Sequence, residues 1–393
     1  MRYAQLERVL GRYYGQNWDA AGERADDVLE RALQETGRQE LRTLLRELDE
    51  LRASGICEPQ LSDVVRYELG CYITPEREGL DMTTWLSHVS DAVRRRVQAL
   101  DAAQLDVLFQ QAVDALDRGD AATLRELLAR HPRLARERLH APGDWLRAQV
   151  GKSLDDFFHA PYLLWFVAED PPRRGRLAPD IADMAQLIVE AARRSGSSIQ
   201  EQLDHALRLV SWSWIARDHG VQIPLIDVLL DAGAVPHGNP ENALVNGNFE
   251  AADHLLQRGA HLTLAAAACL ERWPDVARLA PEATPTARQG ALVLAALHGR
   301  TAAVARLLEY GADANEPSPD LYAHGTPLHH AVCSGSLATV QVLVEAGASL
   351  EREDGVHHGK PVDWAEYYEE QHAGSERARR YTEIAAYLRA RRR

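Results

Sequence analysis

The sequence predicts an all-α protein, in which a small helical bundle is followed by a solenoid of paired helices. Near the N-terminus, leucines recur at helical spacing, as at Leu41, Leu44 and Leu48, which is the pattern of one buried helix face. From about residue 101 the chain repeats pairs of short apolar helices, and Gly290 to Gly325 spans 35 residues. A period of this length is typical of stacked helix–turn–helix units that bury their apolar faces against one another.

The first part of the chain contains no repeat. Apolar runs predict helices near residues 2–13, 23–36, 58–70 and 82–98, around the leucine-rich helix that Ser54 and Gly55 end. The buried faces of these helices should form one core. The expected core residues are Leu6, Leu10, Leu44, Leu48, Leu61, Val65, Trp85 and Val89.

The second part reads as successive helix pairs, most of them closed by a glycine. The expected pairs are 109–117 with 122–130, 160–164 with 181–192, 198–216 with 224–231, 242–246 with 249–257, 264–270 with 274–279, 289–297 with 302–309, a clear unit at 325–349, and a last pair from 360 to 391. Residues 169–180, with paired prolines and arginines, are expected as an insertion in one unit.

Composition limits the function. The chain has 393 residues, with 46% hydrophobic and 26% charged residues, which is typical of a globular protein with two domains or a repeat array. The net charge of -14 opposes binding to nucleic acid or anionic membranes. It suits a basic protein partner, although solubility alone also explains it.

Neither a signal-peptide core nor a membrane-spanning apolar run is visible, so we expect a cytoplasmic protein. The four cysteines, Cys57, Cys71, Cys269 and Cys333, lack metal-ligand spacing and are expected as free thiols. Arginine and alanine predominate over lysine and indicate a GC-rich bacterial coding sequence.

One unit carries a recognisable motif. Thr326–Pro327–Leu328–His329 opens a helix, and a second apolar helix follows before Gly347. This resembles an ankyrin repeat; the resemblance covers residues 101–391 and is close at 325–349. It implies a module that binds other proteins and has no chemistry of its own. Thr326 should cap its helix, and His329 should bond to nearby backbone.

The N-terminal part resembles the immunity-protein family of contact-dependent growth inhibition systems. The matching segments, in the order of the family, are Tyr13–Asp19, Leu48–Leu51, Glu68–Tyr72, Pro75, Gly79 and Trp85–Leu86. The resemblance implies a helical bundle that binds and neutralises a toxin delivered by a neighbouring bacterium. We therefore expect an immunity-like domain at residues 1–98 and an ankyrin-repeat domain at 101–393.

Candidate partner-binding residues are aromatic or acidic side chains at expected surface positions. They are Trp18, Asp19, Asp49, Glu50, Trp212, Trp214, Asp320, Tyr322 and His324. The finger loop 316–324 is the favoured site, because such loops contact partners; an ordinary solvated turn is the alternative. For Trp18 the alternative is packing against Trp85, and for Trp212 and Trp214 it is core packing. A solvated helix face is the alternative for the acids around Asp49.

No catalytic motif is evident. Gly151–Lys152–Ser153 lacks the earlier glycine of a phosphate loop, and the histidines at 357 and 358 suit a solvated loop better than a metal. We expect no enzyme activity, no cofactor, no metal and no catalytic residue. The function that we expect is neutralisation of a toxin, itself basic, by occlusion, with a general ankyrin scaffold or effector as the alternative.

Overall fold

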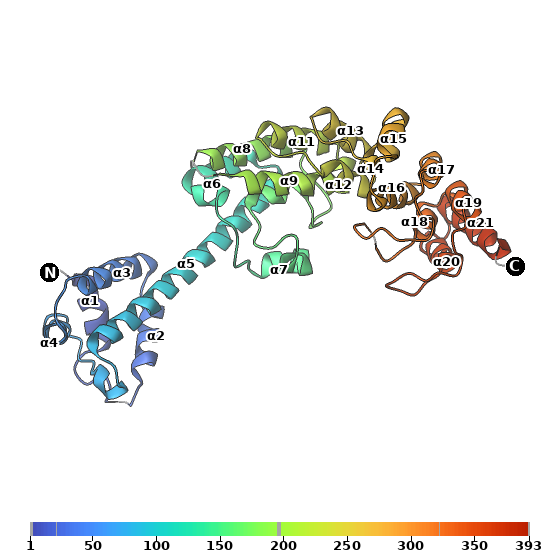
Figure 1. Ribbon diagram of the computed structural model, residues 1–393. Coiled ribbons are helices and arrows are strands. Elements are labelled where there is room, and N and C mark those ends of the chain that lie inside the picture. The colour runs from blue at the N-terminus through green and yellow to red at the C-terminus, as the bar shows by residue number, and fades with distance from the viewer. Residues whose placement is uncertain (1–2, 21, 195–197, 322, 392–393) are drawn as a thin grey trace. The chain divides into compact units, whose positions relative to one another are not determined.

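Helices are the main regular structure in the part of the chain that its computed structural model describes, which is residues 3–391 except 21, 195–197 and 322. No strand occurs among these residues, so the predicted all-α class is confirmed. The chain forms two compact units (Figure 1). One contains Met1–Gln110 and Leu139–Trp145, and the other contains Gln111–Arg138 and Leu146–Arg393.

The first unit is a bundle around one core. Its helices are α1 (Ala4–Leu6), α2 (Ala25–Glu35), α3 (Arg38–Arg52), α4 (Glu58–Asp63) and the first part of α5 (Met82–Arg118), with π-helical turns at Glu7–Gly11 and Val64–Glu68 and a 3-10 turn at Pro75–Glu78. All eight residues that the leucine spacing and its neighbours predicted for the core are buried. The helical period therefore identified the inner faces correctly.

Tyr14 lies at the centre of this core. Its ring meets Trp18 and Trp85 edge-on, with centroids 5.2 and 5.6 Å away. Its hydroxyl donates a hydrogen bond to the Ala25 carbonyl at 2.6 Å, so the buried polar atom is satisfied. Tyr14 therefore contacts both Trp18 and Trp85.

Glu47 differs from the solvated helix face that the sequence suggested. Its side chain is buried, and Oε2 accepts the backbone N–H groups of Gln5 and Leu6 at 2.9 and 2.8 Å. These are donors of the first turn of α1, which have no partner within the helix. Glu47 of α3 therefore holds the first helix in place.

Residues 82–98 and 109–117, expected as separate helices, are parts of one helix, α5. The residues between them contain neither glycine nor proline and are rich in alanine and leucine. Nothing in this stretch stops a helix once it has begun. The helix contributes residues to both units.

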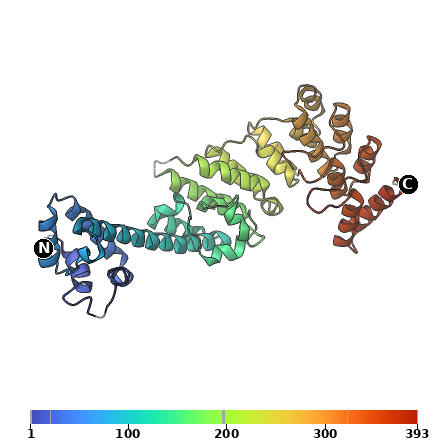
Figure 2. The same cartoon turned by 60° about the horizontal axis from the view of Figure 1, so that its bottom comes forward.

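The second unit is a stack of helix pairs (Figures 1 and 2). The helices after α5 are α6 (Ala121–Arg130), α7 (Asp144–Val150), α8 (Ile181–Arg193), α9 (Gln200–Trp212), α10 (Trp214–Asp218), α11 (Gln222–Asp231), α12 (Asn239–Val245), α13 (Phe249–Gln257), α14 (Leu264–Cys269), α15 (Trp273–Leu279), α16 (Pro285–Leu297), α17 (Thr301–Glu309), α18 (Pro327–Ser334), α19 (Leu337–Glu345), α20 (Pro361–Gln371) and α21 (Glu376–Arg391). Short 3-10 turns lie at Pro132–Ala135, Gly151–Asp155 and Leu163–Ala168.

The first helices of successive pairs form a row. In this row α12 packs on α14, α14 on α16, α16 on α18 and α18 on α20. The second helices α17, α19 and α21 pack in another row. This is the arrangement of a repeat solenoid, in which each unit touches its neighbours.

The Thr326–His329 motif has the structural role that the sequence predicted. Nδ1 of His329 accepts the Thr326 backbone N–H at 3.2 Å, while Nε2 lies 3.1 Å from the Gly359 carbonyl. Nε2 therefore carries the proton and donates a hydrogen bond to the Gly359 carbonyl in the loop before α20. Burial lowers the pKa of His329, which keeps the ring neutral for this role.

Candidate protein-binding surfaces

A groove follows the first helices α12, α14 and α16 in the second unit. Its volume is about 720 Å³, and small or apolar side chains form much of its lining. Among them are Val245, Leu264, Ala287, Ala291 and Leu294.

The charge of this groove is negative. Glu241 and Asp320 line it, and no basic side chain does so among the described residues. Glu241 accepts a hydrogen bond from the Thr263 hydroxyl, whereas Asp320 is exposed on the finger loop. An apolar floor with acidic groups suits a partner segment that combines apolar and basic side chains.

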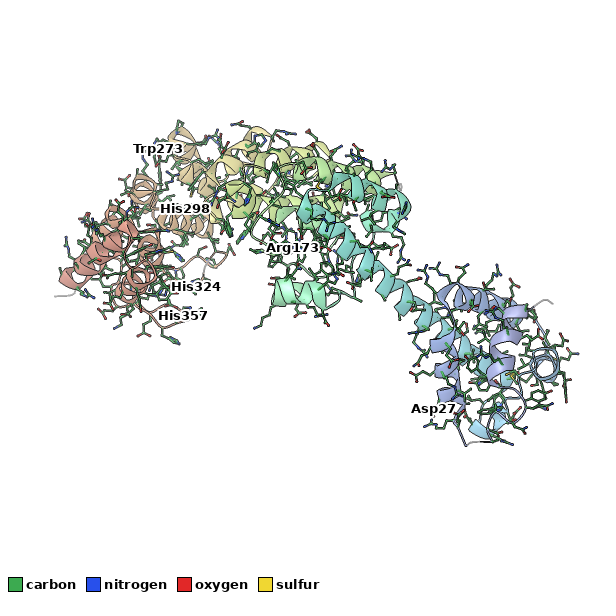
Figure 3. The ribbon with its side chains drawn as sticks, turned by 180° about the vertical axis from the view of Figure 1, so that it is seen from behind. Asp27, Arg173, Trp273, His298, His324 and His357 are labelled. Carbon is green, nitrogen blue, oxygen red and sulfur yellow. The ribbon has the colours of Figure 1, made fainter. Side chains whose placement is uncertain are left out.

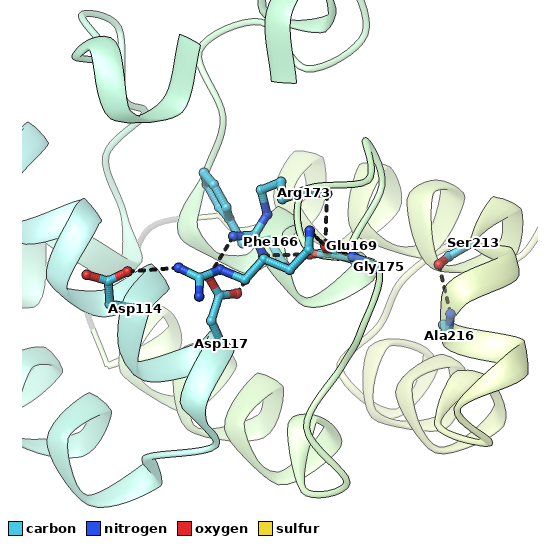
Figure 4. Close-up of polar contacts among 9 residues, drawn as sticks. Asp114, Asp117, Phe166, Glu169, Arg173, Gly175, Ser213 and Ala216 are labelled. Carbon is cyan, nitrogen blue, oxygen red and sulfur yellow. Dashed lines mark hydrogen bonds and ion pairs between the residues drawn. The ribbon is translucent and has the colours of Figure 1, made fainter. Parts of the chain in front are cut away.

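Trp212 and Trp214 lie at a break between two helices. The expected single helix at 198–216 ends at Trp212, because Ser213 is extended and its hydroxyl accepts the Ala216 N–H at 3.0 Å (Figure 4). Serine competes with helical backbone bonds in this way and starts the new helix α10. The amide of Gln222 donates to the carbonyls of Val210 and Ser213 at 2.9 and 3.1 Å, so the break is satisfied.

The break brings both tryptophans to the surface. Trp212 is 36% exposed and Trp214 is 47% exposed, so the core-packing alternative does not hold for them. Trp212 lines the groove together with Asp320. The structure thus unites two of the residues that the sequence proposed from separate segments. Glu241 and Asn242 also line the groove and are not among the residues predicted from the sequence, although their position in the first turn of a first helix was a usable signal.

The longest finger loop is placed in part. Asp320 is exposed, whereas Tyr322 lies outside the described residues. The ring of His324 stacks on Trp364 with centroids 6.0 Å apart, and its carbonyl accepts the Gly355 N–H at 2.7 Å. His324 and His357 lie on neighbouring fingers (Figure 3) and line a hollow of about 590 Å³.

Trp18 and Asp19, in the first unit, take part in the bundle itself. The indole N–H of Trp18 donates to the Tyr72 carbonyl at 3.2 Å, and its ring packs on Tyr14. Asp19 forms an ion pair with Arg77 at 2.7 Å. These contacts favour the packing alternative for Trp18.

Asp49 and Glu50 are exposed on α3 but have basic neighbours. Asp49 lies 3.6 Å from Arg94, and Glu50 lies 3.9 Å from Arg46. Exposed pairs of this kind contribute little stability. The surface around them is therefore mixed in charge rather than acidic.

A further hollow of the first unit lies between α2 and α5. Its volume is about 480 Å³, and Leu29, Leu33 and Ala92 contribute apolar surface. At its edge Nε2 of His88 is 3.1 Å from a carboxylate oxygen of Asp26. This surface is not among those predicted from the sequence, although Leu29 and Leu33 lie at helical spacing.

No group of three or more metal-ligating side chains gathers within the described residues. The thiol of Cys333 donates to the Tyr368 hydroxyl at 3.2 Å. Burial raises the pKa of this thiol, which disfavours the reactive thiolate. None of the described helices has the length and apolarity needed to cross a membrane.

Comparisons with known proteins match two separate parts of the chain. Residues 2–93 match the CdiI immunity protein family, and residues 242–354 match the family of ankyrin repeats in three copies. No curated protein matches the chain. Among solved structures, the crystal structure of the human ASB11 ankyrin repeat domain is 18% identical, with 53% of this chain and 97% of that chain covered and a TM-score of 0.27.

Proposed function

We propose that this chain, which joins a CdiI immunity domain to ankyrin repeats, binds a protein toxin and neutralises it by occlusion. The family match of residues 2–93 carries the proposal. Both matched families are protein-binding modules, so the partner is a protein. A basic toxin domain, cytoplasmic action and the absence of catalysis belong to the same proposal.

The mechanism requires only binding. The net charge of -14 attracts a basic partner over distances of about a Debye length, ~8 Å at physiological salt. Short-range contact is then made by exposed aromatic and apolar side chains, which supply most of the binding energy in protein interfaces. Covering the surface on which the toxin acts removes its activity without any reaction.

The two units offer different surfaces for the toxin. In the first unit the hollow between α2 and α5 combines leucines with Asp26 and His88. In the second unit the groove combines apolar side chains with Asp320 and Glu241. We assign the toxin to the first unit, because the immunity match lies there, and a further contact to the groove.

The test is to produce the full chain together with each toxin encoded beside its gene, and to measure growth rescue and co-purification. Rescue with a stable complex supports the proposal. Failure of both measurements for every neighbouring toxin, with each toxin shown to be active, contradicts it.

Charge-reversal variants of the full chain locate the contact. Asp26→Lys should weaken toxin binding by about tenfold or more if the first unit holds the toxin, and Asp320→Lys should do so if the groove contributes. Asp253→Lys, on helix α13 outside both surfaces, is the matched control. Loss of binding with the control alone would contradict both assignments.

A second function is favoured by the groove. An ankyrin scaffold or effector that binds a protein unrelated to toxins would use the same apolar and acidic surface. It predicts binding that Asp320→Lys abolishes, Asp26→Lys leaves unchanged, and no neighbouring toxin competes for.

A further inference from the structure

A second, smaller hollow adjoins the groove in the second unit. Its volume is about 200 Å³, and its lining includes Asp170, Trp212, Trp214 and Asn246. Trp212 also lines the groove, so the two hollows share a wall. Pockets for small molecules usually hold about 300–1,000 Å³. A hollow of this size suits one side chain of a bound protein.

The hollow contains a carboxylate without a counter-ion. Asp170 is partly buried, and its side chain has no hydrogen bond or ion pair with any residue that the structure describes. Burial raises the pKa of Asp170 to about 6. A desolvated carboxylate is costly unless a cation joins it. The neighbouring Glu169 shows the contrast, because it lies 2.9 Å from the Arg173 guanidinium and accepts the backbone N–H of Gly175 at 3.0 Å.

The aromatic part of the hollow is held in place by backbone contacts. The Asn246 amide donates to the Trp212 carbonyl at 2.8 Å, and Ser213 fixes the start of α10. The segment that carries Asp170 is anchored by Arg173, whose guanidinium contacts Asp117 at 3.0 Å (Figure 4). The surface is therefore formed before any partner arrives, which lowers the cost of binding.

We propose that this hollow binds one arginine side chain of the protein partner. Asp170 supplies the opposite charge, and Trp212 and Trp214 supply indole surface, on which cations bind favourably. Arginine fits better than lysine, because its planar guanidinium stacks on aromatic rings and donates to a carboxylate at the same time. This inference rests on the proposed function only in requiring that the partner is a protein.

The test uses a short probe and the full chain, so that no toxin is needed. Acetyl-Gly-Arg-Gly-amide is titrated into protein labelled with ¹⁵N at the eight tryptophans, and the indole N–H resonances are followed by NMR. The Trp214→Phe variant assigns the resonance of Trp214. We expect saturable shifts at Trp212 and Trp214, with a dissociation constant in the millimolar range for one side chain, about 4 kcal/mol.

Three controls test whether the shifts depend on the charge of arginine and on Asp170. The citrulline peptide has nearly the same shape without the charge, and it should not shift these resonances. Asp170→Asn should weaken binding of the arginine peptide about tenfold, whereas Asp253→Asn on α13 should leave it unchanged. Equal shifts with citrulline, unchanged binding by Asp170→Asn, or shifts confined to other tryptophans would each overturn the proposal.

The outcome is separate from that of toxin neutralisation. Arginine binding with no toxin complex would leave the hollow assigned and reject the proposed function. A toxin complex together with no response to the arginine peptide would support the proposed function and reject the hollow as an arginine site.

Discussion

Arg173 gives the sharpest test of how the insertion at 169–180 is held. Its side chain is 2% exposed, and it contacts Asp117, 5% exposed, and Glu169, which is fully buried. The guanidinium also lies 5.2 Å from the Phe166 ring centroid. We take Arg173→Met as the perturbation, because methionine fills similar space without charge and leaves two buried carboxylates with fewer partners.

The expected cost follows from the contacts that remain. Removing one partner of a buried ion pair costs about 3–5 kcal/mol. Arg174 still lies 2.7 Å from Asp117, and Glu169 keeps its backbone N–H donors, including that of Gly175. Arg173→Met should therefore lower the free energy of unfolding by about 3 kcal/mol, which is the lower end of that range. Arg174→Met is the control, since Arg174 is 37% exposed, and should cost about 1 kcal/mol or less.

Urea is the right denaturant, because guanidinium salt screens the ion pairs. Unfolding of the full chain is followed by circular dichroism, and amide hydrogen exchange of residues 169–180 reports the local effect. Equal losses for Arg173→Met and Arg174→Met, or a loss below about 1 kcal/mol for Arg173→Met, would refute the reasoning.

Three further predictions use other parts of the chain. A Cβ at Gly11 would lie 2.5 Å from the Leu69 carbonyl oxygen, so Gly11→Ala should destabilise by about 1–3 kcal/mol in urea unfolding. A Cβ at Gly37 would meet its nearest atom at 3.5 Å, so Gly37→Ala should cost about 1 kcal/mol or less, which is the loss from a poorer N-cap residue. The pKa of Asp170 is about 6 in the folded chain against an ordinary 3.8, so the folded state binds more protons and its stability falls as pH rises from 4 to 6. Asp170→Asn should remove this dependence and be more stable at pH 8 by about 3 kcal/mol in urea titrations, and equal pH profiles would contradict it. A thiol reagent at pH 8 should react quickly at Cys57 alone, because it is exposed while burial raises the pKa of the other three thiols; fast reaction of two or more would show that the buried thiols are accessible.

Local patterns carried most of the fold. The spacing of Leu44 and Leu48 identified the inner face of α3, because burial of one helix face leaves a direct trace in the sequence. The motif of Thr326 and His329 was also visible in the sequence. His329 bonds to Thr326 within one helical turn and to the Gly359 carbonyl in the following loop. The ends of helices were harder to predict from the sequence. α5 continues where a break between residues 98 and 109 was expected, because the intervening residues permit a helix.

The candidate sites depended more on distant contacts. The sequence proposed Trp212 and Trp214, but whether they were buried was open until the break at Ser213 was seen. At that break the amide of Gln222 donates to the Val210 carbonyl, and Gln222 belongs to α11, which packs on α9. Asp49 and Glu50 looked acidic in sequence, yet Arg94 approaches Asp49 from another helix.

The sequence by itself determined that this chain is a helical bundle followed by stacked helix pairs, and that its N-terminal part resembles an immunity domain. Those features depend on residues close together along the chain, because helical periodicity and helix capping are set by residues within a few positions of one another. Only the tertiary structure decided that Asp170 meets Trp212 and Trp214 in one hollow, and that Asp320 faces the same groove as Trp212. Such meetings arise from packing between segments far apart in sequence, and no local pattern encodes them.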